Sequence, residues 1–574
     1  MDNVTYGQLL EDAAALIEIT GGDPWRARTY ARIGRDLAKR AEPIDPVVAS
    51  GNARSLPGVG ASVEKHLVEL QESGTFALLE ELRAEAPAHI LDLTRISGLG
   101  PKKIRALWQE LGVGSIPELE AVLADGRIAE LKGFGGKSQD NIRAELERLA
   151  RTAGRRPLPA ALRVAGPVLD FLRSLPEVDR AEIAGSVRRG KDLVGDLDFV
   201  VASDAPLAVT QAIVGHSLVR EVIASGPTKT SFMLPGDLQA DVRIVEPEKF
   251  GALLHHFTGS ADHNVAMRAR AKAQGLTISE YGVASVETGE VVACETETDI
   301  FAAVGLPFIE PELREGAGEL QAAEAGRLPQ LVQRRDLRGD LHMHTVASDG
   351  RNTIREMAEA AREFGHDYIC ITDHSKSQTV ANGLDEERLR RHMADIDAVN
   401  DDIDGIIVLK GIEVDILRDG SLDLPGDLLD ELDFVVGSIH ASFRLDRGAM
   451  TERLCKAIAS GHIHCVGHPT ARKLGTRDPI DFDFDAVVAA CLKHRVALEL
   501  NAGAGRLDLH DIHAKRAAAA GVKLLINTDS HSAGGFHQIF FGLCMARRAW
   551  LTSDQILNTR PWDEVRQALG PVPG

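Results

Sequence analysis

The C-terminal part of the chain alternates short apolar runs with longer stretches in which apolar residues recur at helical spacing. Short runs bounded by polar residues are typical of buried strands, and the stretches between them are typical of helices. This alternation predicts a barrel-like βα repeat with a parallel sheet. The predicted strands start at residues Asp340, Tyr368, Ile407, Phe434, His464, Val496 and Val522.

The N-terminal part contains a different repeat, in which a turn of the form apolar-x-Gly-apolar-Gly precedes a stretch of helical spacing. The turns cover residues 56–60, 96–100 and 131–135. Glycine permits a tight bend, and the N–H groups of the following helix can bind a phosphate. The repeat therefore predicts helix-hairpin-helix contacts to the DNA backbone, without base readout. The candidate DNA-binding residues are Gly58, Gly60, Gly98, Gly100, Gly133 and Gly135, with Lys102, Lys103 and Lys137 beyond two of the turns.

The middle of the chain places two aspartates on one predicted strand. Asp196 and Asp198 are two residues apart, so they point to one face and repel each other unless cations lie between them. Asp241 lies on an alternating apolar strand that could lie alongside. Three such carboxylates could hold two Mg²⁺ ions for phosphoryl transfer at a 3′-hydroxyl.

A Gly-Ser turn stands just ahead of the aspartate pair. Gly185, Ser186 and Arg189 offer backbone, hydroxyl and guanidinium donors to a triphosphate. We therefore expect nucleotide binding beside the aspartates.

Histidines and carboxylates recur at the ends of the C-terminal strands. The loops of a βα barrel converge there to form an active site. Imidazole and carboxylate ligands without a thiolate suit Zn²⁺, Mn²⁺ or Fe²⁺, and the set is large enough for two or three ions that activate water against a phosphate ester. The candidate ligands are His342, His344, Asp349, His374, Glu413, His440, His468, Asp529 and His531.

The composition limits how DNA can be bound. The 574 residues carry a formal net charge of −20, and acidic residues outnumber basic ones even within residues 1–150. An excess of Lys and Arg is therefore excluded as the source of affinity for DNA. Backbone amides and metal ions must supply more of the phosphate binding than they do in a typical basic DNA-binding domain. The six scattered cysteines form no C-x-x-C pair, which argues against a disulfide framework and a thiolate zinc site.

The sequence also indicates the cellular compartment in which to expect the protein. It has no apolar run near the ~20 residues needed to span a bilayer, and its start lacks a secretory signal pattern. We expect a cytoplasmic protein with no membrane partner.

The middle motifs resemble the nucleotidyltransferase core of family X DNA polymerases. They read Gly-Ser-Val-Arg-Arg-Gly, Gly-Asp-Leu-Asp, Ala-Asp-Val-Arg and Phe-Thr-Gly-Ser-Ala-Asp-His-Asn. The resemblance implies that Asp196 and Asp198 bind Mg²⁺ or Mn²⁺ and that Asp241 helps to deprotonate the primer 3′-hydroxyl. It further implies that the triphosphate is held by Ser186, Arg189 and Gly195, and the sugar and base by Phe257, Gly259 and Asn264.

Two positions depart from this family pattern. His256 replaces a tyrosine that helps to exclude ribonucleotides, so discrimination between the sugars is open. Where beta-type enzymes have a Schiff-base lysine, the chain has His66 beside Lys65, so lyase activity is not carried over.

The C-terminal ligand set resembles the PHP (polymerase and histidinol phosphatase) domain, and all nine positions match. The two resemblances follow the order of a bacterial family X polymerase with a C-terminal PHP domain. They imply an all-α helix-hairpin-helix N-terminal region, an α+β nucleotidyltransferase palm and a distorted (β/α)7 barrel. The expected limits are 1–90 and 91–155 for two helical regions, 156–310 for palm and thumb-like part, 311–335 for a linker and 336–574 for the PHP domain.

The two resemblances imply gap filling in DNA repair and a 3′→5′ exonuclease. In such proteins the exonuclease is usually manganese-dependent and is sometimes joined by abasic-site cleavage or 3′-phosphate removal. The expected partners are gapped or nicked DNA and dNTPs, bound by a monomer. Two alternatives remain. One is a PHP phosphatase or nuclease with an inactive polymerase half, and the other is a non-catalytic DNA-binding scaffold.

Overall fold

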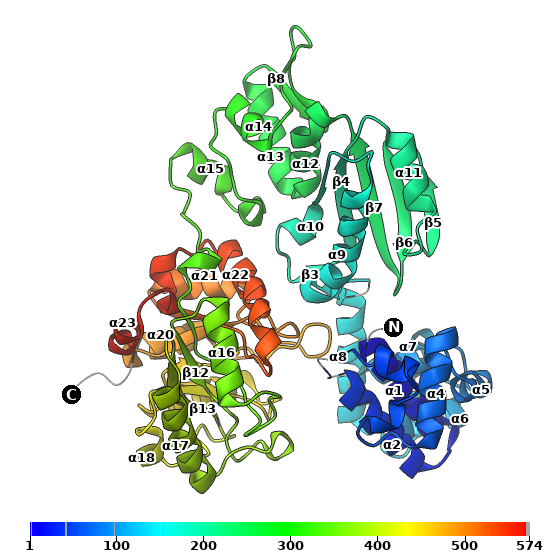
Figure 1. The fold of residues 1–574 in the computed structure, drawn as a ribbon, viewed down its shortest axis with the longest axis vertical. Coiled ribbons are helices and arrows are strands. Elements are labelled where there is room, and N and C mark those ends of the chain that lie inside the picture. Colours follow the sequence, from blue (N-terminus) through cyan, green and yellow to red (C-terminus); the bar gives the residue numbers. More distant parts are fainter. Residues whose placement is uncertain (2, 39, 41–42, 97, 153, 570–574) are drawn as a thin grey trace. The chain divides into compact units, whose positions relative to one another are not determined.

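The computed structural model describes residues 1, 3–38, 40, 43–96, 98–152 and 154–569. The chain forms two compact units, Met1–Ala153 and Gly154–Gly574, which are drawn in Figure 1. The finer domain limits expected from the sequence stay predictions.

The first unit is helical, as the repeat predicts. In each turn the first glycine has the left-handed backbone that favours glycine, with φ of +76° at Gly58, +90° at Gly98 and +93° at Gly133. The second glycine directly precedes a helix, so the predicted turn-then-helix arrangement is confirmed. Ser97 and the side chain of Lys137 lie outside the described residues. The helices are α1 (Asn3–Thr20), α2 (Pro24–Ala38), α3 (Asp45–Ala49), α4 (Ala61–Ser73), α5 (Ala77–Glu85), α6 (Pro101–Leu111), α7 (Ile116–Ala124) and α8 (Gly136–Thr152).

The second unit begins with a mixed five-stranded sheet in the order β2-β4-β7-β6-β5. Strand β4 lies parallel to β7 and places Asp198 opposite Asp241. The helices α9 (Leu158–Ser174) and α10 (Gly185–Arg188) pack beside β4 (Figure 1). The strands are β2 (Arg180–Ile183), β4 (Asp196–Ala202), β5 (Glu221–Ser225), β6 (Lys229–Leu234) and β7 (Leu238–Val245).

A small α/β part follows the sheet. It contains a three-stranded antiparallel sheet and four helices, and its apolar core continues into residues Leu320, Ala323 and Leu331. The segment expected to be a linker, residues 311–335, is thus packed against this part. The elements are α12 (Phe250–Thr258), α13 (Ala261–Ala273), β8 (Leu276–Ser279), β9 (Gly282–Ser285), β10 (Val291–Ala293), α14 (Glu297–Ala303) and α15 (Glu319–Glu324).

The C-terminal part is a seven-stranded parallel sheet in sequential order, so the predicted βα repeat is confirmed. A parallel bridge between Met343 and Ser530 links its first and last segments into a nearly closed barrel. The strands are β11 (Gly339–Asp340), β12 (Tyr368–Ile371), β13 (Ile407–Asp415), β14 (Phe434–Ser438), β15 (Cys465–Val466), β16 (Ala497–Asn501) and β17 (Leu524–Asn527).

Helices surround this barrel on its outer side (Figure 1). They are α16 (Ile354–Phe364), α17 (Glu386–Asp402), α18 (Gly426–Leu429), α19 (Arg447–Ile458), α20 (Phe484–His494), α21 (Asp511–Ala520), α22 (Ile539–Arg548) and α23 (Trp562–Ala568). Among the described helices of the whole chain, none combines the length and apolarity that a membrane crossing requires.

Candidate active sites

The three palm aspartates lie on neighbouring parallel strands. Asp196 and Asp198 lie at the start of β4, and Asp241 lies beside Asp198 on β7. Burial, together with the charges of Asp196 and Asp241, raises the pKa of Asp198 to about 7. This shift shows how strongly the site concentrates negative charge, and carboxylate oxygens are the ligands that Mg²⁺ prefers. The residues therefore fit a divalent cation.

A lysine from the adjacent strand neutralises part of this charge. Lys229 Nζ on β6 lies 2.7 Å from Asp241 Oδ2, and Gln239 donates a hydrogen bond of 3.1 Å to the same carboxylate. Burial alone would raise the pKa of Asp241, but these donors outweigh it and lower the pKa, so Asp241 is ionised at neutral pH. In the described part of the chain, the carboxylates of the three aspartates do not all come within 4.8 Å of one another.

The Gly-Ser turn fits directly against these carboxylates. Gly185 has a φ of +58° and opens the short helix α10, and the N–H of Ala184 donates to the carbonyl of Asp198 over 2.8 Å. Ser186 Oγ is buried and has no hydrogen-bond partner among the described residues. Gly195 directly precedes β4. The turn thus carries a buried, unpaired hydroxyl on the residue that follows Gly185, and Gly185 itself packs on Asp198.

Two hydrogen-bond acceptors hold the guanidinium of Arg189 in one orientation. Its Nε donates to Glu315 Oε1 over 3.0 Å, and its Nη1 donates to the carbonyl of Thr258 over 2.5 Å. A Cβ atom at Gly259 would lie 3.2 Å from this guanidinium, so glycine leaves it room. The predicted triphosphate and sugar segments therefore meet at Arg189.

The predicted sugar and base residues lie on α12, on α13 and, for Gly259, in the turn between these helices. Asn264 Nδ2 donates to the carbonyl of His256 over 2.7 Å, while its Oδ1 is buried without a partner among the described residues. The Phe257 ring is adjacent to His256 and lies 4.7 Å from the guanidinium carbon of Arg243. Burial lowers the pKa of His256, so the ring is neutral at pH 7.

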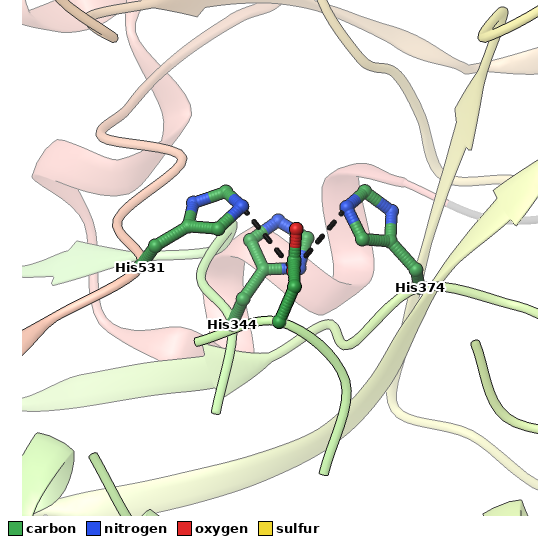
Figure 2. A group of neighbouring side chains, drawn as sticks. His344, His374 and His531 are labelled. Carbon is green, nitrogen blue, oxygen red and sulfur yellow. Dashed lines mark ion pairs between the residues drawn. The ribbon is translucent and has the colours of Figure 1, made fainter. Parts of the chain in front are cut away.

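The nine barrel residues converge on one cluster. Three groups have ligand atoms within 4.8 Å of one another: His344, Asp349, His374 and His531; His342, His344 and Asp529; and His374, Glu413 and His440. The ninth residue, His468, reaches Glu413 Oε1 through Nε2 at 2.9 Å. Figure 2 shows how His344, His374 and His531 face one another from separate segments.

Several buried ligand atoms of this cluster gather around Glu413. Among the described residues, Nδ1 of His374 lies 2.8 Å from Oε2 of Glu413, and Nε2 of His342 and of His440 lie 3.4 and 3.3 Å from its Oε1. None of these contacts has the geometry of a hydrogen bond. Burial opposes protonation of His440, but the carboxylates of Glu413 and Asp415 outweigh it and raise the pKa to about 9. A cation bound by these atoms would satisfy them and displace the proton, so the residues fit divalent metals.

Comparisons with known proteins agree with both sites. A protein of Bacillus subtilis (strain 168), "DNA polymerase/3'-5' exonuclease PolX", is 37% identical over 564 residues and covers 98% of each chain. The chain belongs to the bacterial family X DNA polymerases that carry a PHP domain. Matching family models are "Helix-hairpin-helix domain" over residues 1–76, "SAM-like Helix-hairpin-helix tandem" over 90–148, "DNA polymerase beta thumb" over 253–315 and "PHP domain" over 340–502.

Two further relatives each match one portion of this family X polymerase. "DNA polymerase lambda" of Rattus norvegicus is 28% identical over 331 residues, covering 51% of this chain and 53% of its own. "Probable phosphatase YcdX" of Escherichia coli (strain K12 / DH10B) is 30% identical over 232 residues, covering 39% of this chain and 90% of its own. The polymerase and phosphoesterase parts therefore have separate relatives.

The sequence did not reveal the residues that support the barrel ligands. Glu499 Oε1 lies 2.7 Å from His342 Nδ1, and Asp415 Oδ1 lies 2.5 Å from His440 Nδ1. Such carboxylates fix the orientation of a histidine ligand and increase its basicity. A signal was present, because Glu499 interrupts the apolar run of residues 496–500 and Asp415 follows Glu413 by two residues on β13.

Basic side chains border the barrel cluster of this family X polymerase. Arg506 Nε lies 3.4 Å from Asp529 Oδ2, and its Nη1 is buried without a hydrogen-bond partner among the described residues. Burial and the neighbouring charges of Arg506 and Arg477 lower the pKa of Lys473. Arg506 and Lys473 thus bring positive charge near the candidate ligand Asp529, which suits the binding of a phosphate.

His66 belongs to the core of the N-terminal unit. Its Nδ1 lies 2.8 Å from the Tyr30 hydroxyl, and its ring stacks on Phe76 at 4.7 Å. Burial lowers its pKa. Lys65 points outward and pairs with Glu69 at 3.5 Å. Both residues have structural partners in this arrangement.

Proposed function

We propose that the chain fills short gaps in DNA with dNTPs at the palm and removes 3′-terminal nucleotides at the barrel. The observation that carries this proposal is the presence of two separate clusters of candidate metal ligands, one built of aspartates and the other of histidines and carboxylates. Gapped or nicked DNA and dNTPs are the proposed substrates. We expect a monomer that acts in the cytoplasm, where both substrates are found.

At the palm, Asp196, Asp198 and Asp241 would hold Mg²⁺ or Mn²⁺. The ions would stabilise the charge that develops on the triphosphate and lower the pKa of the primer 3′-hydroxyl. Asp241 is ionised, so its carboxylate can accept the proton of that hydroxyl.

The nucleotide is held by the surrounding donors. Ser186 Oγ and the guanidinium of Arg189 donate to the triphosphate, and the backbone at Gly195 leaves space beside it. His256, Phe257 and Asn264 line the sugar and base, and Gly259 keeps the turn between them open. These roles follow the placement of Arg189 against Thr258 and Gly259.

At the barrel, the nine ligands would hold two or three Mn²⁺, Zn²⁺ or Fe²⁺ ions. The ions would activate a water molecule against a phosphodiester. Glu499 and Asp415 orient His342 and His440, and Arg506 and Lys473 bind the phosphate that is attacked. We propose the removal of 3′-terminal nucleotides, in preference to abasic-site cleavage or 3′-phosphate removal, because the same chain carries a polymerase that extends 3′ ends.

The alternative of an inactive polymerase half is not favoured. Asp198 and Asp241 lie in register on adjacent strands, and the Gly-Ser turn packs against them.

The test is incubation of a one-nucleotide gapped duplex with and without dNTPs, in Mg²⁺ or Mn²⁺. We expect primer extension with dNTPs and shortening to monophosphates without them, with Mn²⁺ favouring the shortening because imidazole ligands prefer transition metals. Extension without shortening would contradict the nuclease assignment, and shortening without extension would contradict the polymerase assignment. If neither reaction occurred, the non-catalytic scaffold would be the better account.

A further inference from the structure

A helix of the PHP barrel packs against the predicted triphosphate turn of the palm. A Cβ atom at Gly190, which ends this turn, would lie 3.0 Å from Cβ of Cys544 on α22. Gly190 has a φ of +64°, so both its backbone and its surroundings favour glycine. Helix α22 of the barrel therefore packs directly against the end of the predicted triphosphate turn.

Arg548, the last residue of α22, contacts the turn directly. Its Nη1 donates to the carbonyl of Arg189 over 2.9 Å and to Glu315 Oε1 over 2.8 Å. Its Nη2 lies 2.7 Å from Asp511 on the barrel helix α21. Only 6% of the Arg548 side chain is exposed, so these contacts form away from solvent.

Glu315 connects this barrel arginine to the proposed triphosphate ligand. The same oxygen that accepts from Arg548 accepts from Arg189 Nε over 3.0 Å. Burial alone would raise the pKa of Glu315, but the guanidiniums of Arg548 and Arg189 outweigh it and lower the pKa, so the carboxylate stays charged. A charged, partly buried carboxylate held between two arginines restricts both of them.

The position of Arg189 matters for the palm because Arg189 caps the C-terminal end of the short helix α10, whose first residue, Gly185, packs on the carboxylate of Asp198. If the Arg189 side chain adopted another orientation, its positive charge would no longer lie near the aspartates or a bound triphosphate. Arg189 is held by two acceptors, Glu315 and the carbonyl of Thr258, and Arg548 fixes the first of them.

We propose that Arg548 is a positioning residue for the incoming dNTP, acting through Glu315 and the backbone of Arg189. A residue of the phosphoesterase domain thus contributes to nucleotide affinity at the polymerase site. This inference rests on the proposed function, in which Arg189 binds the triphosphate.

The same helix offers a matched control. Arg547 precedes Arg548 and also joins the barrel to the end of the thumb, with Nε 2.6 Å from Glu312 Oε1 and Nη2 3.4 Å from Glu310 Oε2. Neither acceptor contacts Arg189 among the described hydrogen bonds and ion pairs. Loss of Arg547 therefore weakens domain docking while sparing the positioning contact.

The experiment compares Arg548→Ala, Arg547→Ala and Arg548→Lys in single-nucleotide filling of a gapped duplex at varied dNTP concentration. For Arg548→Ala we expect KM for the dNTP to rise about 5- to 50-fold with a smaller change in kcat, a range typical of coupling between sites. Arg548→Lys should restore part of the affinity, and Arg547→Ala should leave KM within about twofold of wild type. Exonuclease activity reports whether each variant folds.

A second comparison tests the route through Arg189. In an Arg189→Ala background, Arg548→Ala should raise KM no further, because the guanidinium on which it acts is gone. Glu315→Gln, which keeps the side-chain volume, should raise KM as Arg548→Ala does and replaces that variant if it does not fold. An unchanged KM in Arg548→Ala or Glu315→Gln, or an equal rise in Arg547→Ala, would overturn the inference. Wild-type protein that does not extend the gapped primer would instead overturn the proposed function.

Discussion

Gly185 lies so close to the carboxylate of Asp198 that a Cβ atom at position 185 would be 2.0 Å from Asp198 Oδ2. The left-handed backbone of Gly185 and the hydrogen bond from Ala184 to Asp198 hold the turn against β4. The glycine of the Gly-Ser turn is thus packed directly on the proposed metal ligand Asp198.

Replacing this glycine should damage the polymerase site alone. Gly185→Ala should reduce primer extension by about 100-fold, because the displaced carboxylate can no longer hold its ion in place. Gly215→Ala is a matched control in the same unit, since Gly215 has a φ of −82° and its Cβ would meet nothing closer than 3.5 Å. Extension and exonuclease rates measured on one gapped substrate would decide the point, and normal extension by Gly185→Ala would contradict the assignment of Asp198.

The hairpin turns should control DNA affinity. The double variant Gly58→Ala and Gly98→Ala forces two left-handed turn positions to accommodate a side chain, and we expect gapped-DNA affinity to fall about tenfold with little dependence on sequence. The control is Gly74→Ala with Gly112→Ala, which imposes similar strain at the C-terminal ends of α4 and α6. Fluorescence anisotropy at several salt concentrations would measure both. Equal affinities for the two double variants would remove the hairpin assignment.

The basic residues beside the barrel should be needed for nuclease activity. Arg506→Gln removes a buried guanidinium next to Asp529, so exonuclease activity on a primer should fall by at least about tenfold while extension continues. Arg516→Gln removes an arginine that pairs at the surface with Asp485 and should change neither rate. A wild-type exonuclease rate for Arg506→Gln would show that this group does not bind the phosphate.

Glu297 should make the stability of the thumb depend on pH. Burial would raise its pKa, but the hydrogen bonds from Arg188 and the charge of Arg314 lower it from 4.5 to about 2. Because the folded-state pKa lies below the unfolded one, the contribution is complete above about pH 5 and is lost as pH falls toward 2. At pH 7 it is on the order of 3 kcal/mol.

This dependence can be measured with Glu297→Gln. Thermal melting should show a large loss of stability in the variant at pH 7 and a smaller difference from wild type at pH 4. The surface variant Glu182→Gln, which removes an exposed pair with Arg173, should melt like wild type at both values. A pH-independent difference for Glu297→Gln would contradict the assigned shift.

The sequence predicts much of this architecture for physical reasons that particular residues illustrate. Apolar runs such as Phe434–Ser438 have the length of a strand and become β14 without change. The aspartates are predictable as neighbours because Asp196 and Asp198 are two residues apart on one strand and Asp241 lies on a second strand, β7, whose residues alternate as in a half-buried sheet. The nine barrel ligands are predictable because strand ends converge in a barrel.

Other features depend on distant contacts and leave weaker traces in the sequence. The strand expected from Asp340 extends only over Gly339–Asp340, because His342 and His344 turn into the cluster. Glu413 lies within β13 instead of after it, since that strand continues to Asp415. The bridge from Arg548 to Glu315 joins residues that no local pattern relates, and it follows only from the packing of α22 against the palm.

The central claim is that two independent metal clusters perform two reactions, and separation by mutation tests it most directly. Asp198→Ala should abolish extension of a gapped primer and leave release of monophosphates nearly intact. His440→Ala and His531→Ala should each lower that release by about 10- to 100-fold and spare extension. If Asp198→Ala protein that still folds lost both activities, and degradation by wild type required pyrophosphate and released dNTPs, a single polymerase site would account for everything and the two-site account would be wrong.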